Sequence, residues 1–132
     1  MKSKFIETAV TTVWLEADGI VRLKLHSDLE PGFGLAEAKE FLEAVAKLGR
    51  DKKMPVLNDL RGYPGFSSDR ETRAYVAGEG GHQVFKAVAF LIDSPVSRVV
   101  GNLFLRINKP AYPSQLFTSE AEALEWLKGF VE

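Results

Sequence analysis

The residues best suited to chemistry follow one short apolar stretch, Pro55–Leu60, which is typical of a buried strand. Asp59 lies near its end and Arg61 directly after it. Two further arginines, Arg70 and Arg73, follow along the chain. Open α/β sheets usually bind ligands at the carboxyl ends of their strands, and arginine can hold a carboxylate or phosphate through two hydrogen bonds. These residues therefore predict a clustered anion or partner site, unless the arginines only pair with carboxylates on a solvated surface. The nearby carboxylates are Asp69, Glu71 and Glu79.

Ser68 lies in the same region and has two interpretations. Together with Glu71 it has the spacing of a capping box, in which the hydroxyl accepts a backbone N–H bond at a helix start and stabilises by about 1 kcal/mol. As a phosphoacceptor it would instead carry a phosphate at a helix N-terminus beside Arg70 and Arg73, which favour a dianion. The two roles are compatible, and we take the cap as the main one.

Aromatic side chains are expected near the same end of the sheet. They are Phe33, Tyr63, Phe66 and Tyr112. An apolar pocket lined by them, with an arginine at its mouth, would suit an amphipathic acid or lipid. Aromatic residues in such loops more often fill the core, and we take that as the first interpretation.

The patterns that would indicate catalysis are incomplete. The loop Gly32–Gly34 before a helix has two glycines of a dinucleotide-binding motif, but Glu37 stands where the third is needed. His82 could serve as a base with Ser68 and Asp59, yet the chain has no Gly-x-Ser-x-Gly elbow to present the nucleophile. We therefore expect that the protein is not an enzyme.

One stretch has the alternation of a metal-binding loop. His26, Asp28 and Glu30 are spaced like ligands, but polar residues are expected wherever a strand ends in a loop. The chain has no cysteine and no zinc-ligand spacing. We expect neither a metal ion nor another cofactor.

Composition narrows the range of partners. The 132 residues carry 17 basic and 18 acidic side chains, a net charge of −1, so no long-range field attracts nucleic acid. The absence of cysteine fits a reducing cytoplasm. Polar residues follow Phe5 at once, which argues against a signal peptide, and no apolar run is long enough for a membrane-spanning segment. We expect a soluble, cytoplasmic protein.

The elements that must position these residues begin with a hairpin. Two strands, Val13–Glu16 and Ile20–His26, flank an Asp18-Gly19 step, which is a strong turn signal. In the second strand apolar and polar residues alternate, which indicates one buried face and one wetter face. The hairpin therefore opens a sheet with one face in the core.

Strands and helices alternate after the hairpin. The expected elements are a helix with an apolar stripe from Ala38 to Ala46 and an end at Gly49, the strand Pro55–Leu60, a helix from Ser68 that fades at Gly78, Gly80 and Gly81, a strand within Phe85–Ile92, a helix from Ser94-Pro95 to Ile107, the strand Gln115–Phe117, and a helix capped by Ser119 and Glu122. The order β-β-α-β-α-β-α-β-α predicts one α/β domain over residues 1–132, with helices packed on a mixed, mostly parallel sheet.

At this level the chain resembles the STAS domains of bacterial anti-sigma factor antagonists, and more closely a branch of small bacterial proteins grouped with the CRAL-TRIO lipid-transfer fold. The resemblance covers nearly the whole chain after Val13. It is carried by the stretches Asn58–Gly62, Lys86–Leu91, Asp93–Arg98, Lys109–Pro113 and Ala123–Leu127. It implies a STAS-like fold and a regulatory module that acts by protein contact.

The resemblance also bears on Asp59 and Ser68. In STAS regulators a strand ending in Asp is followed by a loop and a phosphorylatable Ser at the start of the next helix, and Asp59 and Ser68 match these positions. The family's Asp-Ser-Ser-Gly motif is absent, because the local sequence is Phe-Ser-Ser-Asp-Arg over residues 66–70. The resemblance therefore supports the fold more than a phosphorylation switch.

The expected third helix is apolar on more than one side. Val99, Leu103, Phe104 and Leu105 could be covered by a second copy, form the moving wall of a pocket, or lie between the sheet and the last helix. The leading hypothesis is a protein-interaction module, and the alternative is a binder or carrier of a small amphipathic ligand. The contact candidates are Asp59, Arg61, Tyr63, Phe66, Arg70, Arg73, Phe104 and Tyr112.

Overall fold

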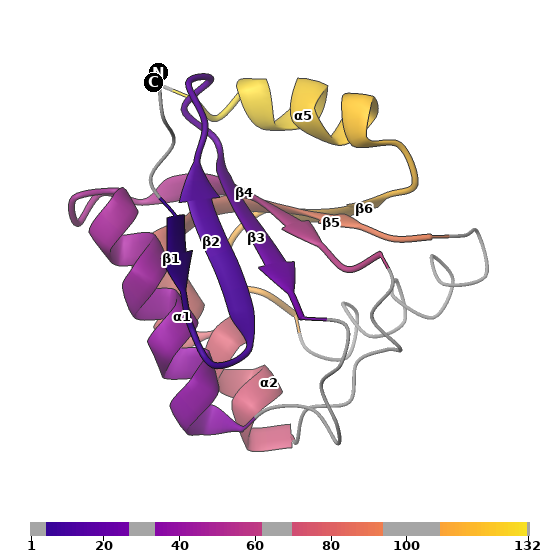
Figure 1. Cartoon of the computed structure of the whole chain (residues 1–132). Coiled ribbons are helices and arrows are strands. Elements are labelled where there is room, and N and C mark those ends of the chain that lie inside the picture. Colours follow the sequence, from indigo (N-terminus) through magenta and orange to yellow (C-terminus); the bar gives the residue numbers. More distant parts are fainter. Residues whose placement is uncertain (1–4, 27–33, 62–69, 94–108, 132) are drawn as a thin grey trace.

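The fold is built on one mixed sheet. The computed structural model describes residues 5–26, 34–61, 70–93 and 109–131. The sheet has 6 strands in the order β1-β2-β3-β4-β5-β6, which is also their order along the chain (Figure 1). They are β1 Phe5–Glu7, β2 Thr11–Leu15, β3 Val21–Leu25, β4 Met54–Asp59, β5 Phe85–Leu91 and β6 Ser114–Phe117. The first three strands pair antiparallel and the last four pair parallel, as predicted for a mixed, mostly parallel sheet.

Helices cover the sheet from both sides (Figure 1). The described ones are α1 Leu35–Leu48, α2 Arg70–Ala77, α3 Glu79–Val84 and α5 Glu120–Lys128. The first three lie on one face and α5 on the other. No helix in the described part of the chain is both long and apolar enough to span a membrane. The helix expected from Ser94 to Ile107 lies outside the described residues.

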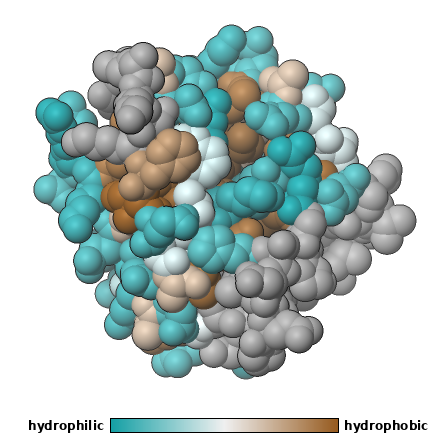
Figure 2. Space-filling model, in the orientation of Figure 1, coloured by the Kyte–Doolittle hydropathy of each residue, from teal (hydrophilic) through white to brown (hydrophobic). Residues whose placement is uncertain are grey.

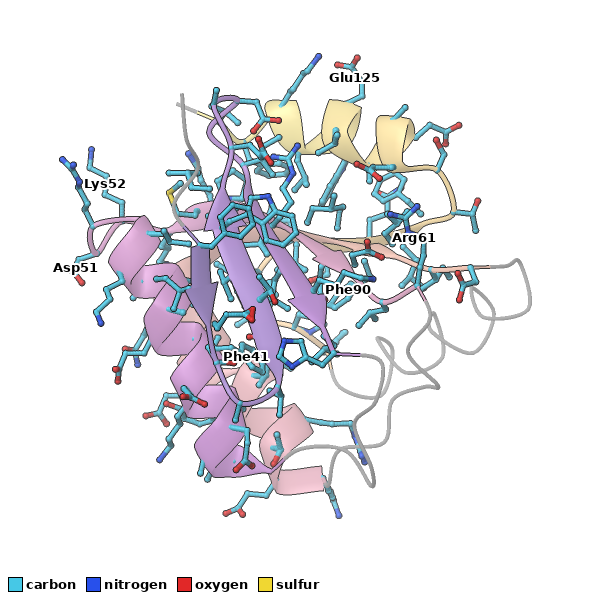
Figure 3. All side chains as sticks on the ribbon, viewed as in Figure 1. Phe41, Asp51, Lys52, Arg61, Phe90 and Glu125 are labelled. Carbon is cyan, nitrogen blue, oxygen red and sulfur yellow. The ribbon has the colours of Figure 1, made fainter. Side chains whose placement is uncertain are left out.

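Each face of the sheet has its own core. On the first face Val21, Leu23, Val56 and Val88 pack against α1 to α3, and Phe41 of α1 belongs to this cluster (Figure 3). On the second face Leu57, Ala87, Ala89 and Leu91 pack against Ala123 and Leu127 of α5. Most of both faces of β4 and β5 is therefore buried, which explains the apolar run from Ala87 to Leu91 within β5.

The predicted hairpin between β2 and β3 is present. Gly19 has φ of +82°, a conformation that glycine adopts without steric cost, and the carboxylate of Asp18 accepts a hydrogen bond from the backbone N–H of Ile20 at 3.0 Å. A β-carbon at residue 19 would lie 3.1 Å from Cγ1 of Val131. The turn therefore needs glycine both for its backbone angle and for close packing against the end of the chain.

The glycines after α2 do not end the helical region. The expected end of the second helix at Gly78 is confirmed, since α2 ends at Ala77, but the helical region then resumes in α3, which runs from Glu79 to Val84 through Gly80 and Gly81. A β-carbon on Gly81 would lie 2.0 Å from the carbonyl oxygen of Val76, and one on Gly80 would lie 2.3 Å from the ring of Tyr75. These glycines allow α3 to pack closely against α2, so they are packing positions rather than helix stops.

The strand β1 was not predicted. It pairs antiparallel with β2 and places Phe5 opposite Trp14. The two rings stack with centroids 5.3 Å apart and an interplanar angle of 19°. The contact between neighbouring strands thus stabilises a segment of 3 residues, which is too short to be recognised from its own pattern.

Candidate functional site

The candidate site lies at the carboxyl edge of β4, on the face of the sheet that carries α5. Asp59 is the last residue of β4, and the strand register places it opposite Lys24 of β3. Glu120 lies in the first turn of α5, a helix whose start is fixed because Ser119 accepts a hydrogen bond from the backbone N–H of Glu122 at 3.3 Å. Arg61 follows β4 and lies beside the start of α5 (Figure 3). Three separate elements therefore position the four charged groups.

Arg61 is the centre of this group. Its Nε donates to Oδ1 of Asp59 at 3.0 Å and its Nη2 donates to Oδ2 at 2.9 Å, which is a bidentate pair. Nη2 also donates to Oε1 of Glu120 at 3.1 Å. Lys24 completes the network, since its Nζ lies 3.5 Å from Oδ2 of Asp59 and donates to the carbonyl oxygen of Arg61 at 3.1 Å. We call these four residues the Arg61 network.

The charges of the network are unequally exposed. The side chain of Asp59 retains only 16% of its surface, whereas those of Lys24, Arg61 and Glu120 retain 43%, 44% and 48%. Nη1 of Arg61 has no hydrogen-bond partner among the described residues. The network thus has a buried carboxylate at its base and an arginine that is held in place yet open to solvent.

Electrostatics fix the protonation of both central groups. Burial alone would raise the pKa of Asp59, but hydrogen bonds from Arg61 and the charges of Lys24 and Arg61 lower the pKa below its ordinary value of 3.8. The hydrogen bond and charge of Asp59 in turn raise the pKa of Arg61. A carboxylate with a lowered pKa is a poor base, and the guanidinium keeps its proton, so this arrangement suits binding an anion better than moving a proton.

The structure brings together only part of the predicted cluster. Asp59 and Arg61 are in contact, as expected, but Arg70 and Arg73 lie on α2, in the layer on the other side of the sheet and far from Arg61 (Figures 1 and 3). Arg70 is exposed and Arg73 is partly buried. The prediction that the three arginines gather at one loop is therefore wrong, and α2 is a separate surface.

Tyr112 is part of the core rather than of a binding surface. Only 8% of it is exposed. Its hydroxyl donates to the carbonyl oxygen of Val76 at 2.8 Å, and its ring meets that of Phe85 edge-on at 5.1 Å. Burial raises the pKa of this hydroxyl. This geometry agrees with the core-filling interpretation of the aromatic residues and does not present Tyr112 to a ligand.

Several other candidates lie outside the described residues, so they stay predictions from sequence. They are the phosphoacceptor candidate Ser68, the contact candidates Tyr63, Phe66 and Phe104, the aromatic residue Phe33, the ligand-like pair Asp28 and Glu30, and the apolar helix residues Val99, Leu103 and Leu105.

The helix start after Gly34 carries its own carboxylate. Gly34 is the N-cap of α1, and Glu37 accepts a hydrogen bond from its backbone N–H at 2.8 Å. A dinucleotide would place its pyrophosphate at such a helix start. The contact gives Glu37 a structural role at the position where the nucleotide motif would need a glycine.

The two histidines lie apart from the network. Nε2 of His26 is 3.3 Å from the hydroxyl of Thr12 and 3.9 Å from a carboxylate oxygen of Glu7, which also accepts a hydrogen bond from Thr12. His82 is exposed on α3, in the helical layer opposite the network. The structure therefore does not bring His82 to Asp59.

Lys24 and Glu120 were missed by the sequence reasoning. The alternation in β3 could have assigned Lys24 to the wetter face of the sheet, but its pairing with Asp59 depends on a strand register that the sequence does not reveal. Glu120 is 59 residues from Arg61. Only the packing of α5 across the sheet brings these two residues together.

The fold defined by these elements is SpoIIAA-like. A crystal structure of an uncharacterised protein of the DUF3478 family from Shewanella loihica PV-4, described as having a SpoIIAA-like fold, is similar with a TM-score of 0.52. The sequences are 12% identical, and the match covers 96% of this chain and 92% of that one. At this identity the likeness establishes the fold alone, which agrees with the STAS-like prediction.

The chain belongs to the family of the domain of unknown function DUF7793, whose model matches residues 13–131. A protein of unknown function from Arthrobacter sp. FB24, with a crystal structure, is 32% identical, and the match covers 87% of this chain and 96% of that one, with a TM-score of 0.31. No functionally curated protein matches the chain.

Proposed function

We propose that this protein is a non-enzymatic interaction module that binds a protein partner at the Arg61 network, through an acidic side chain of the partner. The observation that carries the proposal is the state of Arg61. Two hydrogen bonds that it donates to Asp59 orient its guanidinium, and yet 44% of its side-chain surface remains exposed. An oriented side chain loses less conformational freedom on binding than a mobile one.

Glu120, the second carboxylate of the network, can be displaced from Arg61 by a carboxylate of the partner. The pair between Arg61 and Glu120 is exposed on both sides, and such pairs contribute between about 0 and 1 kcal/mol. A partner carboxylate that approaches Arg61 from solvent can therefore replace Glu120 at small cost while Asp59 keeps the guanidinium in place. Lys24, with its Nζ in the same network, adds a second positive charge to the contact.

The test uses the full chain as bait and a charge-matched control. Arg61→Glu reverses the charge of the network, and Lys52→Glu makes the same change on the exposed turn after α1 (Figure 3). We expect a cellular partner that binds the wild type and the Lys52→Glu variant, and whose affinity, measured with purified proteins, falls at least about tenfold in Arg61→Glu. Circular dichroism would establish that both variants are folded.

A second variant predicts an effect of opposite sign. Glu120→Gln removes the competing carboxylate and leaves Arg61 paired with Asp59, so the partner should bind about twofold to threefold more tightly. Equal affinity for Arg61→Glu and Lys52→Glu, or weaker binding to Glu120→Gln, would remove the network from the interface.

The alternative from sequence, a carrier of a small amphipathic ligand, stays a prediction, because most residues of its aromatic wall are not described. Native mass spectrometry of the purified chain tests it directly. A companion mass that disappears under denaturing conditions would favour the carrier over the interaction module.

A further inference from the structure

One half of the second sheet face, over which no described helix lies, carries an aromatic pair with acidic neighbours. The helix α5 packs on β4, β5 and β6, and no described helix lies over the same face of β1 to β3. The stacked rings of Phe5 and Trp14 lie there. Phe5 is 62% exposed and is the one exposed large hydrophobic residue of the described chain. Figure 2 shows brown, hydrophobic residues among teal, hydrophilic ones on this side of the molecule.

From this arrangement we infer that the Phe5–Trp14 face is a second docking surface, and that its occupant is a basic segment of a protein partner, with arginine or lysine side chains. We call the surface, defined by Phe5, Glu7, Trp14 and Glu16, the aromatic face. The inference does not rest on the proposed function, because it uses other residues and requires a partner segment of opposite charge.

The charge pattern favours a cationic occupant. The carboxylate of Glu16 accepts a hydrogen bond from the indole N–H of Trp14 at 2.7 Å, which fixes a negative charge beside the ring. Glu7 extends from the strand β1 on the other side of the pair, with 64% of its side chain exposed. A guanidinium over the outer ring face of Phe5 would gain a cation–π contact and could reach either carboxylate.

The positive charges of the same face have partners already. Arg22, which the register places opposite Trp14, binds both carboxylate oxygens of Asp18 at 2.7 and 3.0 Å. Lys24 is paired within the Arg61 network. Among the described residues of this face, the charges left to meet an occupant are therefore the carboxylates, and His26 lies beside one of them, Glu7.

A second copy of the chain is a poorer occupant than a basic segment. A symmetric contact through this face would bring Glu7 and Glu16 toward their own copies, and like charges brought together across an interface are unfavourable. An anionic membrane surface meets the same objection. The aromatic rings alone would suit any of these occupants, so the carboxylates decide between them.

The experiment follows the indole N–H resonance of Trp14 in the full chain by nuclear magnetic resonance. The probes are two capped pentapeptides, acetyl-Arg-Leu-Arg-Leu-Arg-amide and its counterpart with glutamate in place of arginine. We expect the basic peptide to shift the Trp14 resonance in a saturable, salt-sensitive manner while the Trp126 resonance stays constant, and the acidic peptide to have no effect.

Two double variants isolate the role of charge. Glu7→Gln with Glu16→Gln removes both charges but keeps oxygen acceptors for Thr12 and for the indole of Trp14. Glu43→Gln with Glu125→Gln makes the same change on the exposed faces of α1 and α5, and Glu125 points away from the sheet (Figure 3). We expect the affinity for the basic peptide to fall about fivefold in the first variant and to stay unchanged in the second.

Four results would overturn the inference. They are no shift of the Trp14 resonance at millimolar peptide, an equal response to the acidic peptide, a dependence of the Trp14 shift on protein concentration without peptide, and binding to neutral phosphatidylcholine vesicles in place of the peptide. The third would assign the face to a second copy and the fourth to a lipid surface. None of them would affect the charge-reversal test at Arg61.

Discussion

The two faces of the sheet differ in composition and in how far the described helices cover them. The first face is largely apolar, although it also buries Thr11, and it is covered by α1 to α3, with Val21, Leu23 and Val56 buried to within 1% of full burial. The second face is apolar only under α5, and beyond that helix it carries Trp14, Arg22 and Lys24, which are partly exposed. The first face is therefore mainly core, whereas the second combines a core under α5 with a partly exposed half.

The largest effect is expected from a pair of neighbours on β3 that point to opposite faces. Leu23→Ala should lower the free energy of unfolding by about 3 kcal/mol, because it leaves a cavity in the first face. Lys24→Ala should cost less than about 1 kcal/mol, since 43% of the lysine side chain is exposed and solvent screens its pair with Asp59. Urea denaturation of both variants tests this, and similar losses would show that the comparison between the faces is wrong.

The next effect concerns the close packing of the helical layer on the first face. Gly81→Ala should destabilise by about 2 kcal/mol, because its β-carbon cannot be accommodated 2.0 Å from the carbonyl oxygen of Val76 without a backbone shift. Gly129→Ala is the matched control at the end of α5, where the nearest atom would be at 3.4 Å. In thermal unfolding, this control should have the melting temperature of the wild type or a slightly higher one. Equal melting temperatures for both would mean that α3 does not pack as described.

A smaller, pH-dependent effect should mark the polar edge of the second face. Because the native pKa of Asp59 is lowered from 3.8, its ionised form stabilises the fold above that pH, and the contribution disappears as the pH falls through the native pKa. Asp59→Asn should therefore cost about 1 kcal/mol near neutral pH and progressively less toward about pH 2. Stability curves of both proteins from neutral to acid pH test this.

The wild type should retain part of this acid sensitivity through Asp18. Burial would raise the pKa of Asp18, but hydrogen bonding and charge from Arg22 lower it overall, so Asp59→Asn should reduce the pH dependence without abolishing it. A difference between wild type and variant that stays constant over the whole range would show that Asp59 is not the titrating group.

The smallest effect is expected at the aromatic face. Phe5→Ala should lower stability by less than about 1 kcal/mol, the range of a cross-strand aromatic pair, because Phe5 remains mostly exposed in the folded chain. Chemical denaturation measures this loss. A loss near that of Leu23→Ala would mean that the residue is structural and would weaken its assignment as a docking surface.

Much of the fold could be predicted because local pattern and burial agree. The alternation of Val21, Leu23 and Leu25 with polar residues predicted the one-sided strand. The step Asp18-Gly19 predicted the turn. In each case the residue's own chemistry selects its backbone conformation or its environment.

The remaining features depend on contacts between distant segments. The glycines after α2 have the composition of a helix stop, but the ring of Tyr75 and the carbonyl group of Val76 give them another role. In the Arg61 network only Asp59 and Arg61 could be identified from sequence, because their contact is local. Glu120 required the placement of α5, and β1 required the partner strand β2.

The order of the strands has a consequence for how the chain folds as it is synthesised. Each strand pairs with the one made just before it, so a growing chain can extend the sheet one strand at a time and does not have to wait for distant partners. The exception is the second face of β4 and β5, where Leu57, Ala87, Ala89 and Leu91 pack against α5, the last described element. Until that helix emerges from the ribosome, the nascent chain exposes an apolar surface that chaperones recognise and that favours aggregation.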